Sequence, residues 1–138
     1  MSAAPANVDV VRRVIFDSPL SRLLGMEEDV IERDRVRLRL PFRPAVTTMS
    51  DVVHGGALSA LADAAATAAA WSGADLSSNP RGTTIALTIN FLAAARGEDL
   101  VADARVIQRG RTVTVCTVSL EDVKGKRVAS ALVTYKLG

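Results

Sequence analysis

The chain has 138 residues, 49% of them hydrophobic and 23% charged, with a formal net charge of +2 and one cysteine. This composition excludes a disordered chain, and the single Cys116 excludes an internal disulfide framework or a cysteine-rich zinc site. The charge is too small to indicate a nucleic-acid partner, and no segment resembles a signal peptide or a membrane span. We therefore expect one domain over residues 1–138, located in the cytoplasm, with no membrane partner.

The first predicted elements are a helix and a strand. Apolar residues recur with helical spacing over about residues 8–24, and the pattern stops at Gly25. Residues 35–40 alternate arginine with an apolar residue, which predicts a strand with one solvated face. We expect the arginines to line its outer face.

An alanine-rich helix is predicted next, over residues 57–71, and it is apolar on nearly every side. A loop rich in glycine, serine and proline follows at residues 72–82. Alternating patterns then predict four strands, over residues 83–92, 99–108, 112–120 and 127–136. This order predicts an α+β domain with a core over residues 26–137, in which a curved antiparallel sheet wraps around one long apolar helix.

Asp63 is the only side chain between Val52 and Ala74 that carries a full charge at neutral pH. A carboxylate in such a helix is costly to bury unless it is paired or functional. Ser59 and Thr67 lie four residues to either side, which makes a narrow polar stripe. The pattern favours a catalytic carboxylate that acts as base or nucleophile. A structural carboxylate, paired with an arginine or a backbone donor, is the alternative.

The segment HGGALSALADA, from His54 to Ala64, resembles the signature of hotdog-fold acyl-CoA thioesterases of the phenylacetyl-CoA and 4-hydroxybenzoyl-CoA type. Later segments follow the same family pattern, so the resemblance covers residues 34–137. It implies a hotdog fold and hydrolysis of an aromatic or medium-chain acyl-CoA to a free acid and coenzyme A, with no metal or redox cofactor. It also implies dimers, often paired into tetramers, with active sites at the dimer interface.

Gly55 and Gly56 stand where the helix begins. Amide groups there have no intrahelical partner and the helix dipole favours negative charge, while glycine allows a close approach to the backbone. We therefore interpret the Gly55 amide as a catalytic donor to the thioester carbonyl and Gly56 as part of the substrate site. A tight turn into the helix is the simpler alternative. Because Gly55 and Asp63 are eight positions apart, about 12 Å along a helix, a working site has to pair them from two subunits.

Three further residues have roles that follow from the resemblance or from its limits. His54 is the only histidine, which excludes a Ser-His-Asp triad or a multi-histidine metal site within one chain, and we expect it to orient the loop at the catalytic centre. Thr84 matches a family Ser or Thr that approaches the catalytic water. Thr48 stands where many family members have Asn or Gln, so the chain departs from the family there.

The remaining predicted contacts concern the substrate. Arg109 and Arg111 flank Gly110 and are candidates for the phosphates of coenzyme A, with Arg96 and Arg81 as further candidates. Exposed arginines at turns are usually only solvated. Ser59 and Thr67 are expected beside the substrate.

The acyl pocket is expected to use Leu58, Leu61, the 72–82 loop and the N-terminal helix. Two alternatives remain open: a non-catalytic acyl-CoA-binding module, and a hotdog hydratase or dehydratase.

Overall fold

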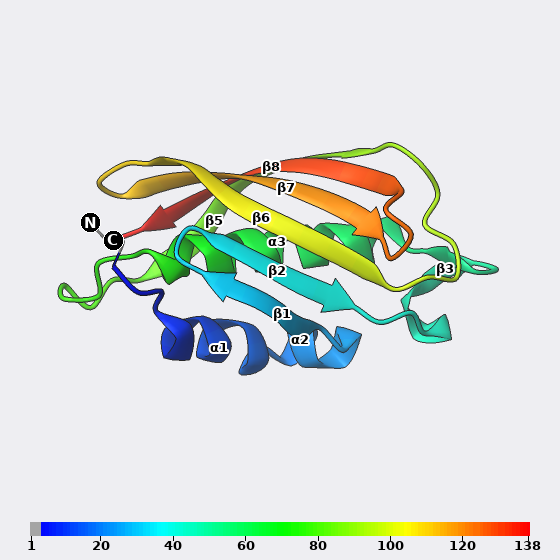
Figure 1. Cartoon of the computed structure of the whole chain (residues 1–138), viewed down its shortest axis with the longest axis horizontal. Coiled ribbons are helices and arrows are strands. Elements are labelled where there is room, and N and C mark those ends of the chain that lie inside the picture. The colour runs from blue at the N-terminus through cyan, green and yellow to red at the C-terminus, as the bar shows by residue number, and fades with distance from the viewer. Residues whose placement is uncertain (1–3) are drawn as a thin grey trace.

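The computed structural model describes residues 4–138 (Figure 1). Helices α1 (Val8–Phe16) and α2 (Pro19–Leu24) precede strands β1 (Glu27–Glu32) and β2 (Arg35–Leu40). A short 3-10 turn (Pro44–Val46) and the strands β3 (Thr47–Met49) and β4 (Val52–Val53) lead to α3 (Gly55–Ser72). The chain ends in β5 (Gly82–Phe91), β6 (Leu100–Arg109), β7 (Val113–Asp122) and β8 (Arg127–Leu137).

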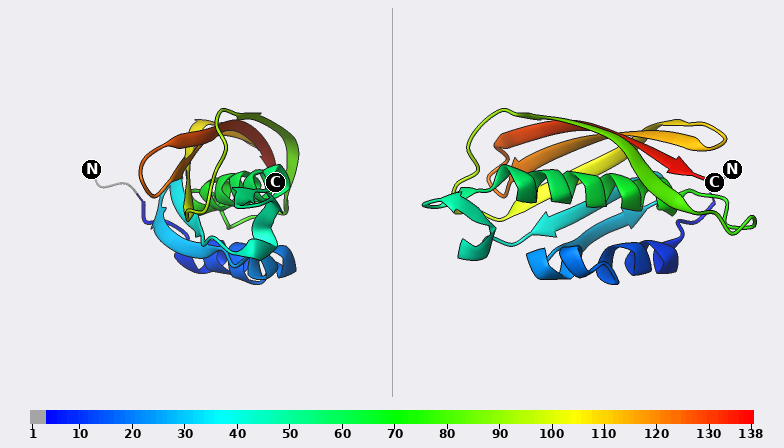
Figure 2. Two further views of the ribbon diagram at one scale, coloured as in Figure 1. Left: turned by 90° about the vertical axis from the view of Figure 1, so that its right-hand side faces the viewer. Right: turned by 180° about the vertical axis from the view of Figure 1, so that it is seen from behind.

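Six antiparallel strands form one sheet in the order β1-β2-β6-β7-β8-β5, which leaves β5 at one edge. The sheet curls over α3, and α1 and α2 lie on the side of α3 that the sheet leaves open (Figure 2). Ten of the 18 residues of α3 are buried, eight of them alanine or serine, and such small side chains let the helix lie close to the sheet. The predicted α+β architecture, a curved sheet around one apolar helix, is confirmed.

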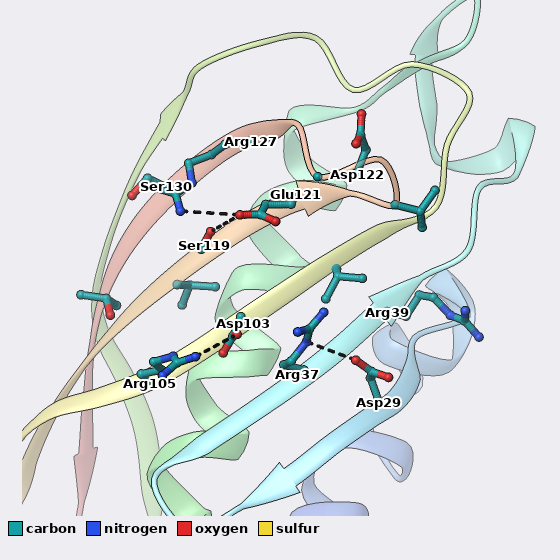
Figure 3. Close-up of a pocket in the computed structure, with 15 residues that line it drawn as sticks. Asp29, Arg37, Arg39, Asp103, Arg105, Ser119, Glu121, Asp122, Arg127 and Ser130 are labelled. Carbon is teal, nitrogen blue, oxygen red and sulfur yellow. Dashed lines mark hydrogen bonds and ion pairs between the residues drawn. The ribbon is translucent and has the colours of Figure 1, made fainter.

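The outer face of β2 carries the predicted arginines. Val36, Leu38 and Leu40 point into the core and are at most 1% exposed. The arginines between them pair with acidic side chains on both neighbouring strands: Arg37 with Asp29, Arg39 with Glu27, and Arg35 with Asp103 (Figure 3 shows the first pair). These cross-strand pairs fix the acidic strand β1 against β2.

The prediction of one continuous helix over residues 8–24 is wrong, because two helices occupy this segment. The first ends at Phe16 and the second begins at Pro19. Proline has no amide hydrogen to donate and disfavours helical geometry at Ser18, the residue before it. The predicted stop at Gly25 is confirmed: this residue caps α2 with a φ of 76°.

The strand at residues 83–92 also differs from its predicted alternation. Thr84 pairs with Tyr135 and Ala86 with Thr134, so Ile85 is an extra residue that forms a β-bulge. Because of the bulge, Thr84 shares the inner face of β5 with Leu87, whereas strict alternation places them on opposite faces. Ile85 is left 53% exposed at the sheet edge.

Among residues 4–138, no helix is both long enough and apolar enough to cross a bilayer.

Candidate active site

Asp63 lies half-buried near the middle of α3 and faces β5. The Thr84 hydroxyl donates a 2.6 Å hydrogen bond to Asp63 Oδ1. A bond this short is typical of a hydroxyl and an ionised carboxylate. The bulge at Ile85 turns Thr84 inward, so an irregularity of β5 orients the carboxylate on α3. The structure pairs Asp63 with a hydroxyl and with neither an arginine nor a lysine of residues 4–138.

At the start of α3, His54 occupies the N-cap position. Its Nδ1 accepts a 2.7 Å hydrogen bond from the Gly56 amide, and its carbonyl accepts from Ala57 and Leu58. This arrangement leaves the Gly55 amide as the first donor of α3 without an acceptor in the described part of the chain. His54 therefore shapes the turn, and its Nδ1 is the unprotonated ring nitrogen. The free donor at the helix end belongs to Gly55.

The Gly55 backbone lies under the ring of Phe91, at the end of β5. A β-carbon on Gly55 would lie 3.2 Å from Phe91 Cζ, so even a methyl group would press on the ring. Phe91 is 53% exposed at the sheet edge. The Gly55 backbone thus lies beside the end of β5, the edge strand of the sheet.

Gly55 and Asp63 do not form one site within a protomer. They are eight residues apart on one continuous helix, about 12 Å along its axis. One carbonyl group cannot contact both.

A cavity of about 160 Å³ opens on the other side of Asp63, between α3 and the two N-terminal helices. Its apolar lining comes from both helix layers: Val14, Ile15, Leu20, Met26, Ala60 and Ala64. Its polar lining is Asp63 together with the hydroxyls of Ser18, Ser21 and Thr67. The candidate catalytic carboxylate is therefore part of the wall of an otherwise largely apolar cavity.

The other predicted substrate residues are placed differently. The Ser59 hydroxyl donates to the Gly55 carbonyl at 2.9 Å, within its own helix. Thr48 is exposed on β3 and does not line the cavity. Leu58 and Leu61 are 3% and 0% exposed and belong to the core, and neither lines this cavity. The cavity lining also contains no residue of the 72–82 loop.

Arg109 is engaged in the fold. Its Nη2 lies 2.8 Å from Asp34 Oδ1 and donates to the Ala70 carbonyl at 3.0 Å, near the C-terminus of α3. A cation there is favoured by the helix dipole. These contacts satisfy Nη2, so we now assign Arg109 to stabilising the end of α3.

The other arginines are near the surface. Arg111 is exposed beside a hollow of about 620 Å³ that Arg33 and Asp75 also line. Arg96 pairs with Asp51 at 3.2 Å, and Arg81 is exposed. Arg109 lines the same hollow, but Asp34 and the Ala70 carbonyl hold its Nη2, so Arg111 is the more exposed hairpin arginine for a phosphate contact.

A buried tyrosine lies close to the candidate site. Tyr135 is 5% exposed, and its hydroxyl accepts a 2.9 Å hydrogen bond from Trp71 Nε1. Burial raises the pKa of Tyr135, and the negative charge of Asp63 raises it further, whereas the hydrogen bond from Trp71 lowers it. The phenol is therefore neutral at ordinary pH. Sequence alternation did not single it out, because an aromatic residue in a strand is ordinarily part of the core.

Another hollow, of about 730 Å³, lies on the outer face of the sheet, and about half of its lining residues are charged (Figure 3). Arg105 pairs there with Asp103, and Arg127 with Glu121. None of the candidate catalytic residues lines it, so we place the chemistry at Asp63.

Comparisons with known proteins identify the family of the chain. Residues 51–129 match the family model of the thioesterase superfamily. The medium/long-chain acyl-CoA thioesterase YigI of Escherichia coli K12 is 27% identical over 90% of this chain and 88% of its own length.

Solved structures of thioesterase family proteins are also similar to this chain. A thioesterase family protein from Silicibacter pomeroyi is 28% identical, with a TM-score of 0.88 over 94% of this chain and 96% of the other. The E. coli PaaI protein from the phenylacetic acid degradation operon has a TM-score of 0.79 at 22% identity, over 88% and 85% of the two chains, and so shares the fold.

Proposed function

The chain belongs to the thioesterase superfamily, and we propose that it hydrolyses an acyl-CoA to a free acid and coenzyme A at Asp63. The same comparisons confirm the hotdog thioesterase fold predicted from the sequence. One observation carries the proposal: a carboxylate held by the Thr84 hydroxyl forms part of the wall of a cavity lined mostly by apolar side chains. Such an arrangement holds a base beside a place for an acyl group.

In the proposed reaction, Asp63 accepts a proton from a water molecule as the water oxygen attacks the thioester carbon. The carbonyl oxygen becomes an oxyanion, which the amide of the partner subunit's Gly55 stabilises. When the tetrahedral intermediate collapses, the carbon–sulfur bond breaks and the thiolate of coenzyme A leaves with the electron pair. The proton held by Asp63 neutralises that thiolate or passes to solvent. Water and these groups suffice, so the proposal includes no metal or redox cofactor.

A carboxylate can also attack the carbonyl itself and form an anhydride. Single-turnover hydrolysis in ¹⁸O-labelled water distinguishes the two routes. Direct attack by water puts the label in the released acid, whereas attack by Asp63, followed by water opening the anhydride at the Asp63 carbonyl, puts it first in the Asp63 carboxylate.

We further propose that two protomers pair through β5. This strand has a neighbour on one side only, so its other edge has backbone groups available for pairing. Ile85, Phe91 and Leu92 are each more than half exposed along it. If two β5 strands pair antiparallel about a two-fold axis between residues 87 and 88, Thr84 of one strand lies opposite the partner's Phe91. That register brings Asp63, held by Thr84, toward the partner subunit's Gly55 under Phe91. Pairing of dimers into a tetramer stays a prediction.

Thiol release from a panel of aromatic and aliphatic acyl-CoAs tests the function. Wild type is compared with Asp63→Ala and Asp63→Asn, and the oligomer is checked by size-exclusion chromatography. We expect both variants to lose about 100-fold or more in kcat with the oligomer intact. Hydrolysis that persists in both variants would move the chemistry away from Asp63. A folded wild type that binds acyl-CoA without releasing thiol would instead be an acyl-CoA-binding module.

Complementation tests the shared site. Asp63→Ala and Gly55→Val are each expected to be inactive as homodimers. A mixed dimer contains one site in which both residues are intact, so a random mixture should recover about a quarter of wild-type activity. If each site instead lay within one protomer, both subunits of every mixed dimer would be defective and no activity would return.

The hydratase or dehydratase alternative finds no support in the site. That chemistry needs a histidine beside the acyl group, and the only histidine, His54, does not line the cavity. Its Nδ1 is bonded to the Gly56 amide.

A further inference from the structure

We propose that Tyr135, the buried tyrosine of β8, is a positioning residue for the carboxylate of Asp63. Its hydrogen bond with Trp71 fixes the start of β5 against α3, and this contact holds Thr84 where its hydroxyl reaches the carboxylate. The inference rests on the function proposed above, because it concerns the geometry of the same site. It gives Tyr135 and Trp71 a role in the rate of hydrolysis, although neither side chain forms a hydrogen bond with Asp63 within residues 4–138.

Two side-chain hydrogen bonds join α3 to β5 and β8 in the described part of the chain. Near the middle of the helix, the Thr84 hydroxyl donates to Asp63 at 2.6 Å. About two turns further on, Trp71 Nε1 donates to the Tyr135 hydroxyl at 2.9 Å. Thr84 and Tyr135 are direct neighbours, because they pair in the register of β5 and β8. The two bonds therefore close one ring of contacts through the helix and the sheet, so a shift at one bond is transmitted to the other.

The β-bulge makes the orientation of Thr84 depend on β8. It lies between Thr84 and Ala86, so it separates the first three residues of β5, Gly82 to Thr84, from the regular part of the strand. Since β5 is an edge strand, residues 82–84 have only the end of β8 as a neighbour in the sheet of one protomer. A bulge also bends the strand and increases its twist. The end of β8, which includes Tyr135, therefore sets the direction of the Thr84 side chain.

Tyr135 is packed between α3 and the start of β5. Its side chain is 5% exposed and shares a small apolar cluster with Ala70 and Trp71 of α3. A β-carbon on Gly82 would overlap the Tyr135 hydroxyl, so glycine allows the hydroxyl to lie over the backbone of β5. Burial raises the pKa of Tyr135 and the charge of Asp63 raises it further, so the phenol and the carboxylate are close enough to interact. Tyr135 thus connects the helix that carries the carboxylate to the strand that orients it.

The first test compares kcat and KM of wild type and Tyr135→Phe, with the acyl-CoA that wild type hydrolyses fastest. The variant removes the hydroxyl and keeps the ring. We expect kcat to fall about fivefold to tenfold and KM to stay within about twofold, because the carboxylate is misoriented while the contacts to the substrate are intact. Trp71→Phe removes the donor of the same bond and should give the same loss, so it also serves if Tyr135→Phe does not fold.

Thr114→Val is the matched control. Thr114 pairs with Tyr135 from the other side, in β7, and is 2% exposed. Its hydroxyl accepts a hydrogen bond from Arg109 Nη1, so its removal affects a buried hydroxyl that is not connected to Thr84. We expect kcat of Thr114→Val to stay within about twofold of wild type. Equal losses in Thr114→Val and Tyr135→Phe would overturn the proposal, because they would show a general effect of packing under the sheet.

A double-mutant cycle separates positioning from general destabilisation. If Tyr135 acts through Thr84, its hydroxyl has no influence once the bond from Thr84 to the carboxylate is gone. Tyr135→Phe should therefore lower kcat less than about twofold in a Thr84→Val background. Losses that multiply in the double variant would overturn the proposal, and so would a Tyr135→Phe enzyme with wild-type kcat.

Gly82→Ala tests the same contact with both bonding groups present, because its methyl group displaces the Tyr135 hydroxyl. Trp71 is the only tryptophan, so its indole N–H gives a single nuclear magnetic resonance signal. This signal should move upfield in Gly82→Ala and in Tyr135→Phe, as the hydrogen bond is lost, and kcat should fall by the same factor in both. An unchanged signal in Gly82→Ala would overturn the placement of the hydroxyl over Gly82. A shifted signal with wild-type kcat would overturn the positioning role.

The side-chain carboxyl ¹³C resonance of Asp63 separates this inference from the proposed function, because it reports the bond from Thr84 without any substrate. Tyr135→Phe should shift this resonance in the same direction as Thr84→Val, and Thr114→Val should leave it unchanged. If the resonance responds in this way but wild type hydrolyses no acyl-CoA, the hydrolysis is refuted and the positioning of the carboxylate is kept. If hydrolysis depends on Asp63 but Tyr135→Phe leaves the resonance unchanged, the function is kept and this inference is refuted.

Discussion

The contact between Thr84 and Asp63 gives the sharpest mechanistic prediction. Thr84→Val removes the hydroxyl and keeps the branched shape of the side chain. The lost hydrogen bond is 2.6 Å long and goes to a carboxylate. Hydrogen bonds to charged groups contribute about 1.5–3 kcal/mol. If the bond orients the carboxylate in the transition state, its loss should lower kcat by about 10- to 150-fold.

The expected loss is confined to kcat. Thr84 contacts the carboxylate, so KM should change little in Thr84→Val. Valine suits a strand and Thr84 is only partly buried, so the free energy of unfolding in urea should stay within about 1 kcal/mol of wild type. Steady-state thiol release with hexanoyl-CoA gives both kinetic constants.

Thr84→Ser is the control, because it keeps a hydroxyl at the same position. It should retain kcat within about threefold of wild type. A Thr84→Val enzyme with wild-type kcat would refute the orienting role. An equal loss in both variants would attribute the effect to strand packing at the bulge.

Three further predictions follow from neighbouring parts of the structure. Gly55→Ala should lower kcat/KM by at least about tenfold, because its methyl group would lie 3.2 Å from Phe91 Cζ and obstruct the approach to the amide. The exposed Phe91 ring has room to shift and alanine favours the helix, so the unfolding free energy should stay within about 1 kcal/mol of wild type. Arg109→Ala should lower the unfolding free energy in urea by about 2–4 kcal/mol, because it removes the contacts to Asp34 and the Ala70 carbonyl. Arg111→Ala should leave the unfolding free energy within about 0.5 kcal/mol of wild type, and it should raise KM several-fold if Arg111 contacts coenzyme A. Burial raises the pKa of the Cys116 thiol from 9.0 to about 11, so the folded state binds the thiol proton more tightly than the unfolded chain does. The resulting contribution to the free energy of unfolding is fully present below pH 9 and is lost as the pH rises to 11. Urea titrations should show a steeper loss of stability over that range in wild type than in Cys116→Ala, and a thiol reagent at pH 8 should label the folded protein far more slowly than the unfolded chain; equal slopes or equal labelling would contradict the burial effect.

The order of helices and strands could be predicted from periodicity, because most of the elements have one buried face. The arginine alternation of residues 35–40 is the clearest case, since the intervening side chains are almost completely buried. The break between α1 and α2 is harder to predict because apolar spacing continues across it. Pro19 nevertheless marks the break in the sequence.

The orientation of Thr84 could not be predicted from the alternation of its strand. The sequence around it alternates without interruption, and the extra residue, Ile85, appears only in the pairing of β5 with β8. A bulge depends on the partner strand as well as on local propensity. The family resemblance placed Thr84 near the catalytic water, and the structure adds the bond to Asp63 and the bulge that permits it.

The role of Arg109 was hidden for a similar reason. In the sequence it stands beside Gly110 at a turn, where an arginine is ordinarily solvated. Its partners, Asp34 and the carbonyl of Ala70, are distant along the chain and come together only because β6 ends beside the C-terminus of α3. Long-range contacts of this kind leave no local pattern.

The polar stripe on α3 shows how one helix face can serve separate purposes. Ser59 bonds to its own helix, Asp63 to β5, and Thr67 only lines the cavity. The role of each residue of the stripe therefore depends on which element packs against it. Because β5 fixes the carboxylate while α1 and α2 form the opposite wall of the cavity, we expect changes in the N-terminal helices to leave the carboxylate in place. Leu20→Ala and Thr84→Val should accordingly have additive effects on the free energy of activation, since Leu20 lines the cavity from α2, Thr84 bonds to Asp63 from β5, and the two side chains share no hydrogen bond.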